Sequence, residues 1–164
     1  MSSERPPGLT SEQFRRACGR FATGVTIATV IGPHGAPHGL TVSSFTSVSL
    51  TPPLISICLG HEVSEMDLFR AASFFGINVL SENQRPISER FARRGHPRFD
   101  GLDWRPGSTG VPLITGVLAT LECHVEQRIT AGDHDIFLGR VLRAHVAEGK
   151  PLLYFASGYR RLAE

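Results

Sequence analysis

The sequence contains little cysteine and no pairing pattern for it. Cys18, Cys58 and Cys123 are the three cysteines of a 164-residue chain, and no two of them form a C-x-x-C pair. Cys58 and Cys123 are surrounded by apolar residues. We therefore expect reduced, buried thiols rather than disulfides.

Long apolar runs are also missing. The two longest, residues 25–31 and 54–59, are far shorter than the roughly 20 residues that cross a bilayer, so we expect no membrane span. Residues 1–8 hold Ser, Glu, Arg and Pro without the apolar segment of a secretory signal. This composition predicts a cytoplasmic protein.

Charge of one sign is not in excess, since the chain contains 17 Lys and Arg and 15 Asp and Glu. Binding to nucleic acid needs a concentrated basic face. The densest basic cluster, residues 90–98 with four arginines, is interrupted by acidic and apolar residues. We interpret it as a local anion site and expect no nucleic acid partner.

Several chemistry-bearing motifs are absent. The chain has no G-x-G-x-x-G dinucleotide loop, no G-x-S-x-G nucleophile elbow, and no P-loop, because Gly149-Lys150 is followed by Pro151. His34 and His38 are four residues apart, but they lie in a Gly/Pro-rich turn that fixes no common orientation of the rings. We expect no metal site.

Apolar periodicity predicts a mainly β chain with flanking helices. With 41% hydrophobic residues, it is sized for one domain, which we place at residues 10–164 after a flexible N-terminus of residues 1–9. Many short strands and few helices indicate an antiparallel barrel or sandwich. Helices are expected near residues 10–24, 64–69 and 84–93, a long loop at 95–110, and strands at 25–31, 39–49, 54–59, 74–80, 117–126, 135–146 and 152–155.

Hydroxyl residues alternate with apolar ones along residues 41–49. A plain surface strand accounts for this pattern. Alternatively, hydroxyls and backbone N–H groups beside apolar side chains suit a flat heteroaromatic ligand with a phosphate tail. The pattern alone leaves both interpretations open.

An ordered set of motifs resembles the flavin reductase family of FMN-binding split barrels. The resemblance covers residues 14–162 and rests on FATGVT at 21–26, GLTVSSFTSVS at 39–49 with PPL at 52–54, FGINVLS at 75–81, GDH at 132–134, Gly139 with Val141, PLLYF at 151–155 and GY at 158–159. It implies a homodimeric, antiparallel, Greek-key-like split β-barrel with flavin near the subunit interface. The ligands implied are FMN, with FAD as an alternative, and NADH or NADPH as hydride donor. A separate monooxygenase would receive the reduced flavin.

The resemblance also implies site residues. Residues 41–49 line the ring and ribityl chain, and Ser64 marks a phosphate-binding element in which His61 and Glu62 replace the usual basic residue, so the arginines of residues 90–98 would supply the charge. His134 is the catalytic candidate, because an imidazole can donate to a carbonyl or steady charge on a reduced ring; otherwise it is an exposed turn histidine. The full set of cofactor contacts is Thr26, Thr41, Val42, Ser43, Ser44, Ser47, Val48, Ser49, Ser64, Asn78, Phe91 and Tyr159.

Some of these assignments have structural alternatives. Tyr159 either contacts the nicotinamide or packs at the C-terminus, and Asn78 and Phe91 either border the pocket or serve a turn and the core. For the whole chain, the prediction is an NAD(P)H:flavin oxidoreductase. The rivals are a flavin carrier or sensor without turnover, and an enzyme that retains flavin and reduces an organic substrate directly.

Overall fold

A computed structural model describes residues 8–95 and 97–163. The flexible N-terminus expected at residues 1–9 lies, for residues 1–7, outside the described residues. The strands are β1 (Thr23–Gly24), β2 (Thr26–Ile31), β3 (Pro37–Val42), β4 (Thr46–Leu50), β5 (Pro53–Gly60), β6 (Phe74–Val79), β7 (Trp104–Pro106), β8 (Pro112–Ile114), β9 (Ala119–Ala131), β10 (His134–Val146), β11 (Leu153–Phe155) and β12 (Gly158–Arg160). The α-helices are α1 (Ser11–Cys18), α2 (Met66–Ala71) and α3 (Arg85–Ala92).

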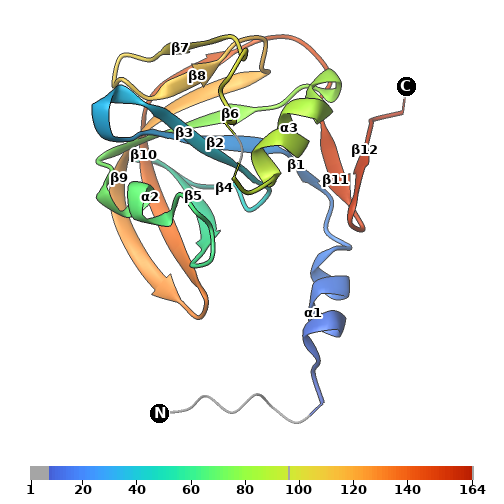
Figure 1. Cartoon of the computed structure of the whole chain (residues 1–164). Coiled ribbons are helices and arrows are strands. Elements are labelled where there is room, and N and C mark those ends of the chain that lie inside the picture. The colour runs from blue at the N-terminus through green and yellow to red at the C-terminus, as the bar shows by residue number, and fades with distance from the viewer. Residues whose placement is uncertain (1–7, 96, 164) are drawn as a thin grey trace.

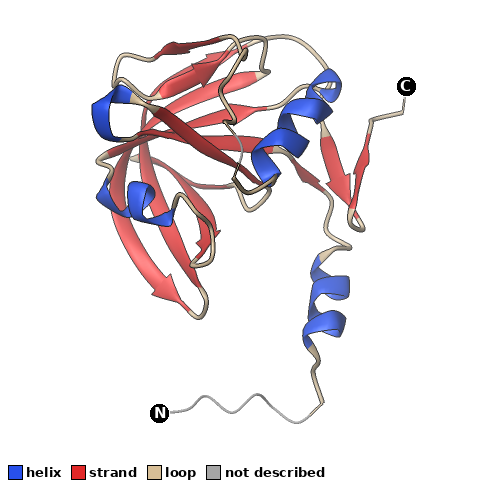
Figure 2. Ribbon diagram, in the orientation of Figure 1, coloured by secondary structure: helices blue, strands red, loops and turns tan. Residues whose placement is uncertain are grey.

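One antiparallel sheet of seven strands forms the body of the molecule, in the order β3-β2-β6-β9-β10-β5-β4 (Figures 1 and 2). The mainly β, antiparallel fold class is therefore confirmed. The sheet is not closed into a barrel, because β3 and β4 remain its two edges. Smaller sheets, β1-β11-β12 and β7-β8, flank it.

The expected strand at residues 39–49 is two strands on opposite edges of the sheet. The chain leaves β3 after Val42 and enters β4 at Thr46. Between them, the Ser44 hydroxyl donates to the Cys58 carbonyl at 3.0 Å and accepts from the Cys58 amide at 2.9 Å, which ties the connection to β5. A side chain thus takes over backbone hydrogen bonds of Cys58, which hydroxyl–apolar alternation cannot indicate.

Helix α1 is locally well formed but buries none of its residues. Thr10 and Gln13 make a capping box, with the Thr10 hydroxyl accepting from the Gln13 amide at 3.1 Å. The helix extends away from the sheet (Figure 1), and the Phe14 side chain is 57% exposed. Cys18 is exposed as well and Cys58 is half-buried. The expectation of buried thiols is therefore confirmed for Cys123 and was wrong for Cys18, because α1 buries none of its residues.

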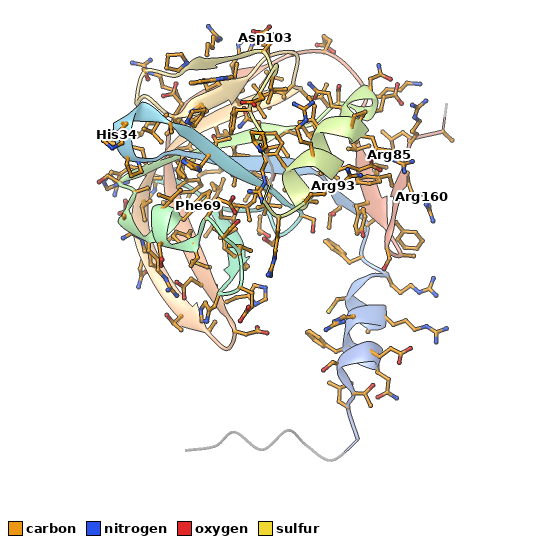
Figure 3. All side chains as sticks on the ribbon, viewed as in Figure 1. His34, Phe69, Arg85, Arg93, Asp103 and Arg160 are labelled. Atoms are coloured by element: carbon orange, nitrogen blue, oxygen red, sulfur yellow. The ribbon has the colours of Figure 1, made fainter. Side chains whose placement is uncertain are left out.

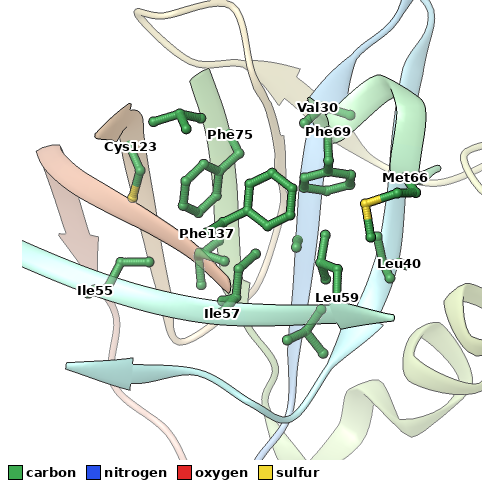
Figure 4. Close-up of a cluster of buried hydrophobic side chains, with 14 residues drawn as sticks. Val30, Leu40, Ile55, Ile57, Leu59, Met66, Phe69, Phe75, Cys123 and Phe137 are labelled. Atoms are coloured by element: carbon green, nitrogen blue, oxygen red, sulfur yellow. The ribbon is translucent and has the colours of Figure 1, made fainter. Parts of the chain in front are cut away.

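The core consists of two apolar clusters. In the larger, the rings of Phe69 and Phe137 meet edge to face at 6.0 Å between centroids (Figure 4). Phe75 lies against Gly139, where an added Cβ would be 2.4 Å from the ring. In the smaller cluster, Phe91 of α3 packs on β2 and on the segment before β11.

Helix α3 therefore covers one end of the sheet, close to the C-terminal hairpin β11–β12 (Figure 1). Strand β12 was not predicted. The turn before it, Ala156-Ser157, has φ values of 48° and 61°, a conformation usually marked by Asn or Gly. Neither residue is present at these two positions, so the turn lacks the usual Asn-Gly signal.

Candidate functional site

A hollow of about 180 Å³ brings three of the predicted contact residues together. Thr41 comes from β3, Ser64 from the segment before α2, and Phe91 from the last turn of α3. The complete lining is Leu40, Thr41, Val63, Ser64, Glu65, Phe91, Ala92, Arg94 and Arg98. Two arginines of the cluster at residues 90–98 thus lie beside the predicted phosphate-binding serine.

The two arginines differ in their partners. Arg98 is 8% exposed, pairs with Glu65 and donates to the Gly39 carbonyl at 2.6 Å. Its charge is therefore balanced inside the fold. Arg94 is exposed and has no ion pair within residues 8–95 and 97–163. The positive charge available to an anion in this hollow is that of Arg94.

Several predicted contact side chains already hold backbone groups. The hydroxyl of Thr26 donates to the Val42 carbonyl at 2.8 Å, and that of Thr41 to the Ser88 carbonyl at 2.6 Å. Buried Asn78 donates to the Ile27 carbonyl and accepts from the Ile114 amide at 2.7 Å. Such fully engaged groups set the shape of the site.

Other predicted contacts remain available to a ligand. Ser43 and Ser47 are exposed, and their side chains have no hydrogen bond within the described part of the chain. Val48 is 51% exposed, whereas Val42 and Phe91 are buried in the core and Ser49 is half-buried. The segment between β3 and β4 thus offers hydroxyls beside apolar surface.

His134 lies apart from that hollow, at the start of β10. Its Nδ1 is 2.7 Å from Asp133 Oδ1, and this hydrogen bond lowers the pKa of Asp133 below its ordinary value. The half-exposed ring lies over Gly60 and lines a different hollow of about 420 Å³ with Leu9 and Phe14. Within one chain, the structure does not bring His134 together with Thr41 and Ser64.

A polar network beside His134 was missed. Asp135, the residue that follows His134, is only 4% exposed. It accepts from Arg70 Nε at 2.8 Å and Thr130 Oγ1 at 3.0 Å, and its Oδ1 lies 2.9 Å from His61 Nε2. The Arg70 hydrogen bond, then that of His61, holds the pKa of Asp135 well below its usual range. His61, expected near a phosphate element, therefore anchors the turn that carries His134.

Tyr159 lines a third hollow, of about 350 Å³, beside the start of α3. Its hydroxyl lies 2.8 Å from Ser88 Oγ, and the guanidinium carbon of Arg85 lies 5.1 Å from its ring centroid. Ser88 thus contacts both Thr41 and Tyr159. Hydroxyls and guanidinium groups on the two sides of Ser88 suit anionic, phosphate-bearing ligands.

Two other features bear on the classes of protein considered above. No helix in the described part of the chain has the length and apolar character to cross a membrane. Across residues 8–95 and 97–163, no cluster of three or more His, Cys, Asp or Glu side chains is arranged to hold a metal ion.

Comparison with known proteins gives consistent relatives. The chain is 44% identical over 158 residues to the FMN reductase (NADH) SmoA of Agrobacterium fabrum, covering 96% of this chain and 90% of that protein. It is 36% identical to the flavin-dependent monooxygenase reductase subunit HsaB of Rhodococcus jostii, covering 92% of this chain and 77% of the relative.

A solved structure matches at the level of the fold. The NADH:FAD oxidoreductase SgcE6 of Streptomyces globisporus, in complex with NAD and FAD fragments, superposes with a TM-score of 0.88 at 40% identity, covering 93% of this chain and 92% of that chain. Residues 18–163 match the family described as flavin reductase like domain. The chain is therefore a member of the flavin reductase family.

Proposed function

We propose that this protein is an NADH-dependent flavin reductase. The observation that carries the proposal is the hollow in which Thr41, Ser64 and the unpaired Arg94 meet, in a chain whose relatives include an FMN reductase and an NADH:FAD oxidoreductase. A bound flavin accepts hydride from the reduced nicotinamide, and the protein supplies binding and orientation.

The residues present fit a flavin phosphate and ring. Arg94 supplies the guanidinium for the phosphate, beside Ser64, whose hydroxyl donates to Glu65 at 2.7 Å in this structure and would turn to a phosphate oxygen when the ligand binds. Ser43 and Ser47, free of other side-chain partners in the described residues, hold the polar edge of the flavin. Thr26, Thr41, Ser44 and Asn78 fix the backbone that presents these groups. FMN and FAD share the parts of the ligand assigned here.

The proposal includes a homodimer that completes the site. His134 and Tyr159 are the proposed nicotinamide contacts, yet His134 lies outside the hollow formed by Thr41 and Ser64. Leu50 is 93% exposed and Phe21 78%, which is apolar surface that a second copy would cover. The molar mass measured by light scattering during gel filtration tests this. A mass of twice the 17.9 kDa chain supports the dimer, and a mass of one chain contradicts it.

A partner and a location follow from the same proposal. Because a relative is the reductase subunit of a flavin-dependent monooxygenase, we infer that a separate oxygenase receives the reduced flavin. A cytoplasmic location agrees with free thiols at all three cysteines.

The activity is tested by following NADH oxidation after the purified protein has been desalted. Turnover that appears only with added FMN or FAD supports a reductase that treats flavin as a substrate. Flavin binding without NADH oxidation would contradict the proposal and indicate a carrier or sensor. Turnover that reduces an organic acceptor with flavin retained on the protein would contradict the release of reduced flavin.

The phosphate assignment has its own test. Arg94→Ala should raise the KM for FMN about tenfold, because a charge-assisted contact to phosphate is lost. The KM for riboflavin, which lacks the phosphate, should not change. Arg105→Ala is the matched control, since Arg105 is exposed on β7 with no ion pair in the described residues. An equal effect of Arg94→Ala on FMN and riboflavin would place the phosphate elsewhere.

A further inference from the structure

Asp135 is a buried carboxylate that joins three segments of the chain directly beside His134. One of its oxygens accepts from Arg70 Nε of α2 at 2.8 Å. The other accepts from Thr130 Oγ1 of β9 at 3.0 Å and lies 2.9 Å from His61 Nε2, which follows the end of β5. Both oxygens therefore have partners, as a buried charge requires.

Helix α2 is fixed on the strand that carries Asp135. Phe69, labelled in Figure 3, precedes Arg70 in α2, and its ring meets that of Phe137 in β10 at 6.0 Å between centroids. Both rings are fully buried. Because a close-packed core resists displacement, the backbone that presents Arg70 keeps its place relative to Asp135.

His61 holds the turn before His134 through a second contact. The His61 amide donates to the Asp133 carbonyl at 2.9 Å, in addition to the contact between the His61 ring and Asp135. Gly132 and Asp133 form the two-residue turn between β9 and β10. One residue thus binds both the turn and the buried carboxylate.

Strand geometry connects the buried carboxylate to the His134 ring. Successive side chains of a strand point to opposite faces, so Asp135 points into the fold and His134 points outward. The ring lies over Gly60, where an added Cβ would be 3.5 Å from His134 Nε2. The hydrogen-bond partner of the ring, Asp133, has a side chain that is 95% exposed. Since an exposed pair contributes little, the buried neighbour sets the direction of His134.

We propose that Asp135 is a positioning residue for His134, with Arg70 and His61 as the groups that fix its carboxylate. The inference rests on the proposed function, in which His134 contacts the nicotinamide, and deepens it by naming what orients the ring. Asp135 acts through the backbone of β10 and contacts no ligand itself.

Amide hydrogen exchange of the protein without ligands, followed by NMR, tests the positioning directly. Asp135→Asn keeps the side-chain volume but removes the charge. The exchange rate of the His61 amide, which reports on the turn, should therefore rise about tenfold relative to that of the Cys58 amide, which donates to Ser44 on the far side of β5. An unchanged ratio would overturn the proposal, because any loss of stability would then be general.

A double-mutant cycle shows whether Asp135 acts through His134. Asp135→Asn should lower kcat/KM for NADH about tenfold in the wild type and have no further effect in the His134→Ala background, where the oriented ring is gone. Losses that multiply would contradict the positioning role. The affinity for FMN, measured by fluorescence quenching, should not change, because Ser64 is held separately through Glu65 and buried Arg98. A loss of FMN affinity would contradict the proposal as well.

Glu126→Gln is the matched control. Glu126 pairs with Arg140 at 2.6 Å near the middle of the β9–β10 hairpin, away from its turn, so both readouts should match the wild type. If Asp135→Asn does not fold, Arg70→Ala removes one partner of the carboxylate from a side chain that is 43% exposed, and it should raise the same exchange ratio. If the wild type shows no turnover, the proposed function fails, and the exchange ratio still decides whether Asp135 holds the turn.

Discussion

Ser88 and Tyr159, 71 residues apart in sequence, place their hydroxyl oxygens 2.8 Å from each other. Ser88 is fully buried and its carbonyl also accepts from Thr41. This one residue of α3 therefore joins β3, at the edge of the main sheet, to the C-terminal hairpin. Through these two hydrogen bonds, Ser88 connects the hollow lined by Thr41 to the hollow lined by Tyr159.

Removing the Tyr159 hydroxyl should remove the hydrogen bond between the hairpin β11–β12 and Ser88 of α3, while the aromatic ring keeps its packing contacts. We expect Tyr159→Phe to reduce the free energy of unfolding by about 1 kcal/mol, the net value of one such hydrogen bond. Urea denaturation measures it. Tyr154→Phe is the control, because the Tyr154 ring packs on Tyr159 at 5.4 Å but its hydroxyl has no hydrogen bond among the described residues. Equal effects of the two variants would mean that the contact with Ser88 contributes nothing.

The ion pair between Arg98 and Glu65 is buried, with side-chain exposures of 8% and 12%. Arg98→Ala leaves the Glu65 carboxylate without its partner and should destabilise the fold by about 3 kcal/mol. Arg105→Ala should change stability by no more than about 0.5 kcal/mol. A double variant lacking both Arg98 and Glu65 should be more stable than Arg98→Ala alone. If it is less stable, the cost comes from lost packing instead.

Glu122 should contribute to stability in a pH-dependent way. Burial raises the pKa of its carboxyl, but hydrogen bonds from the Thr109 amide at 2.8 Å, the Thr109 hydroxyl at 2.7 Å and the Ser108 hydroxyl at 3.0 Å outweigh burial and lower the pKa. A carboxyl whose pKa is lower in the folded state stabilises the fold above its unfolded pKa, and this contribution disappears as the pH falls through the folded pKa.

Glu122→Gln should therefore cost about 1–2 kcal/mol at neutral pH and progressively less in acid. Urea denaturation from pH 7 to pH 3 measures the difference in the free energy of unfolding between the variant and the wild type. Asp135, whose pKa is also lowered, is present in both proteins, so its contribution cancels in this difference. Glu148→Gln, at an exposed position without a described partner, should show no such trend. A constant difference across this pH range would contradict the role of the ionised carboxylate.

Thr23 carries a buried hydroxyl that has no hydrogen-bond partner in the described structure. Replacing it by an isosteric methyl should remove a desolvation cost, and we expect Thr23→Val to raise the free energy of unfolding by about 1 kcal/mol. Thr26→Val should do the opposite, because the Thr26 hydroxyl donates to the Val42 carbonyl. A loss of stability in Thr23→Val would show that a ligand or second subunit satisfies this hydroxyl.

The three thiols should differ in reactivity. Burial, with a smaller effect of the Glu122 charge, raises the pKa of Cys123 to about 12, so it forms no thiolate at neutral pH. Cys18 is exposed on α1. A disulfide reagent should therefore modify Cys18 rapidly and Cys123 only after unfolding, and Cys18→Ser should abolish the fast phase. A fast phase that persists in Cys18→Ser would show that the half-buried thiol of Cys58 reacts instead, and the absence of a fast phase in the wild type would show that α1 is covered in solution.

Local patterns in the sequence were enough to predict most of the helices and strands and to identify the family. Three patterns involve only neighbouring residues and can be recognised without knowing the fold. They are the β-branched run that forms β2, the period-two alternation of β9 and the capping box of α1. The ordered motifs identified a flavin reductase because they extend over nearly the whole chain.

Tertiary structure alone decided which of these residues meet. The segment at 41–49 divides between opposite edges of the sheet, Arg98 pairs with Glu65 across 33 residues, and Glu122 is buried although strand alternation predicts an exposed side chain. These outcomes depend on which segments cover one another, because a polar residue is buried only where another part of the chain supplies its hydrogen bonds. Sequence thus determined the elements and the kind of chemistry, and packing between distant segments determined the site.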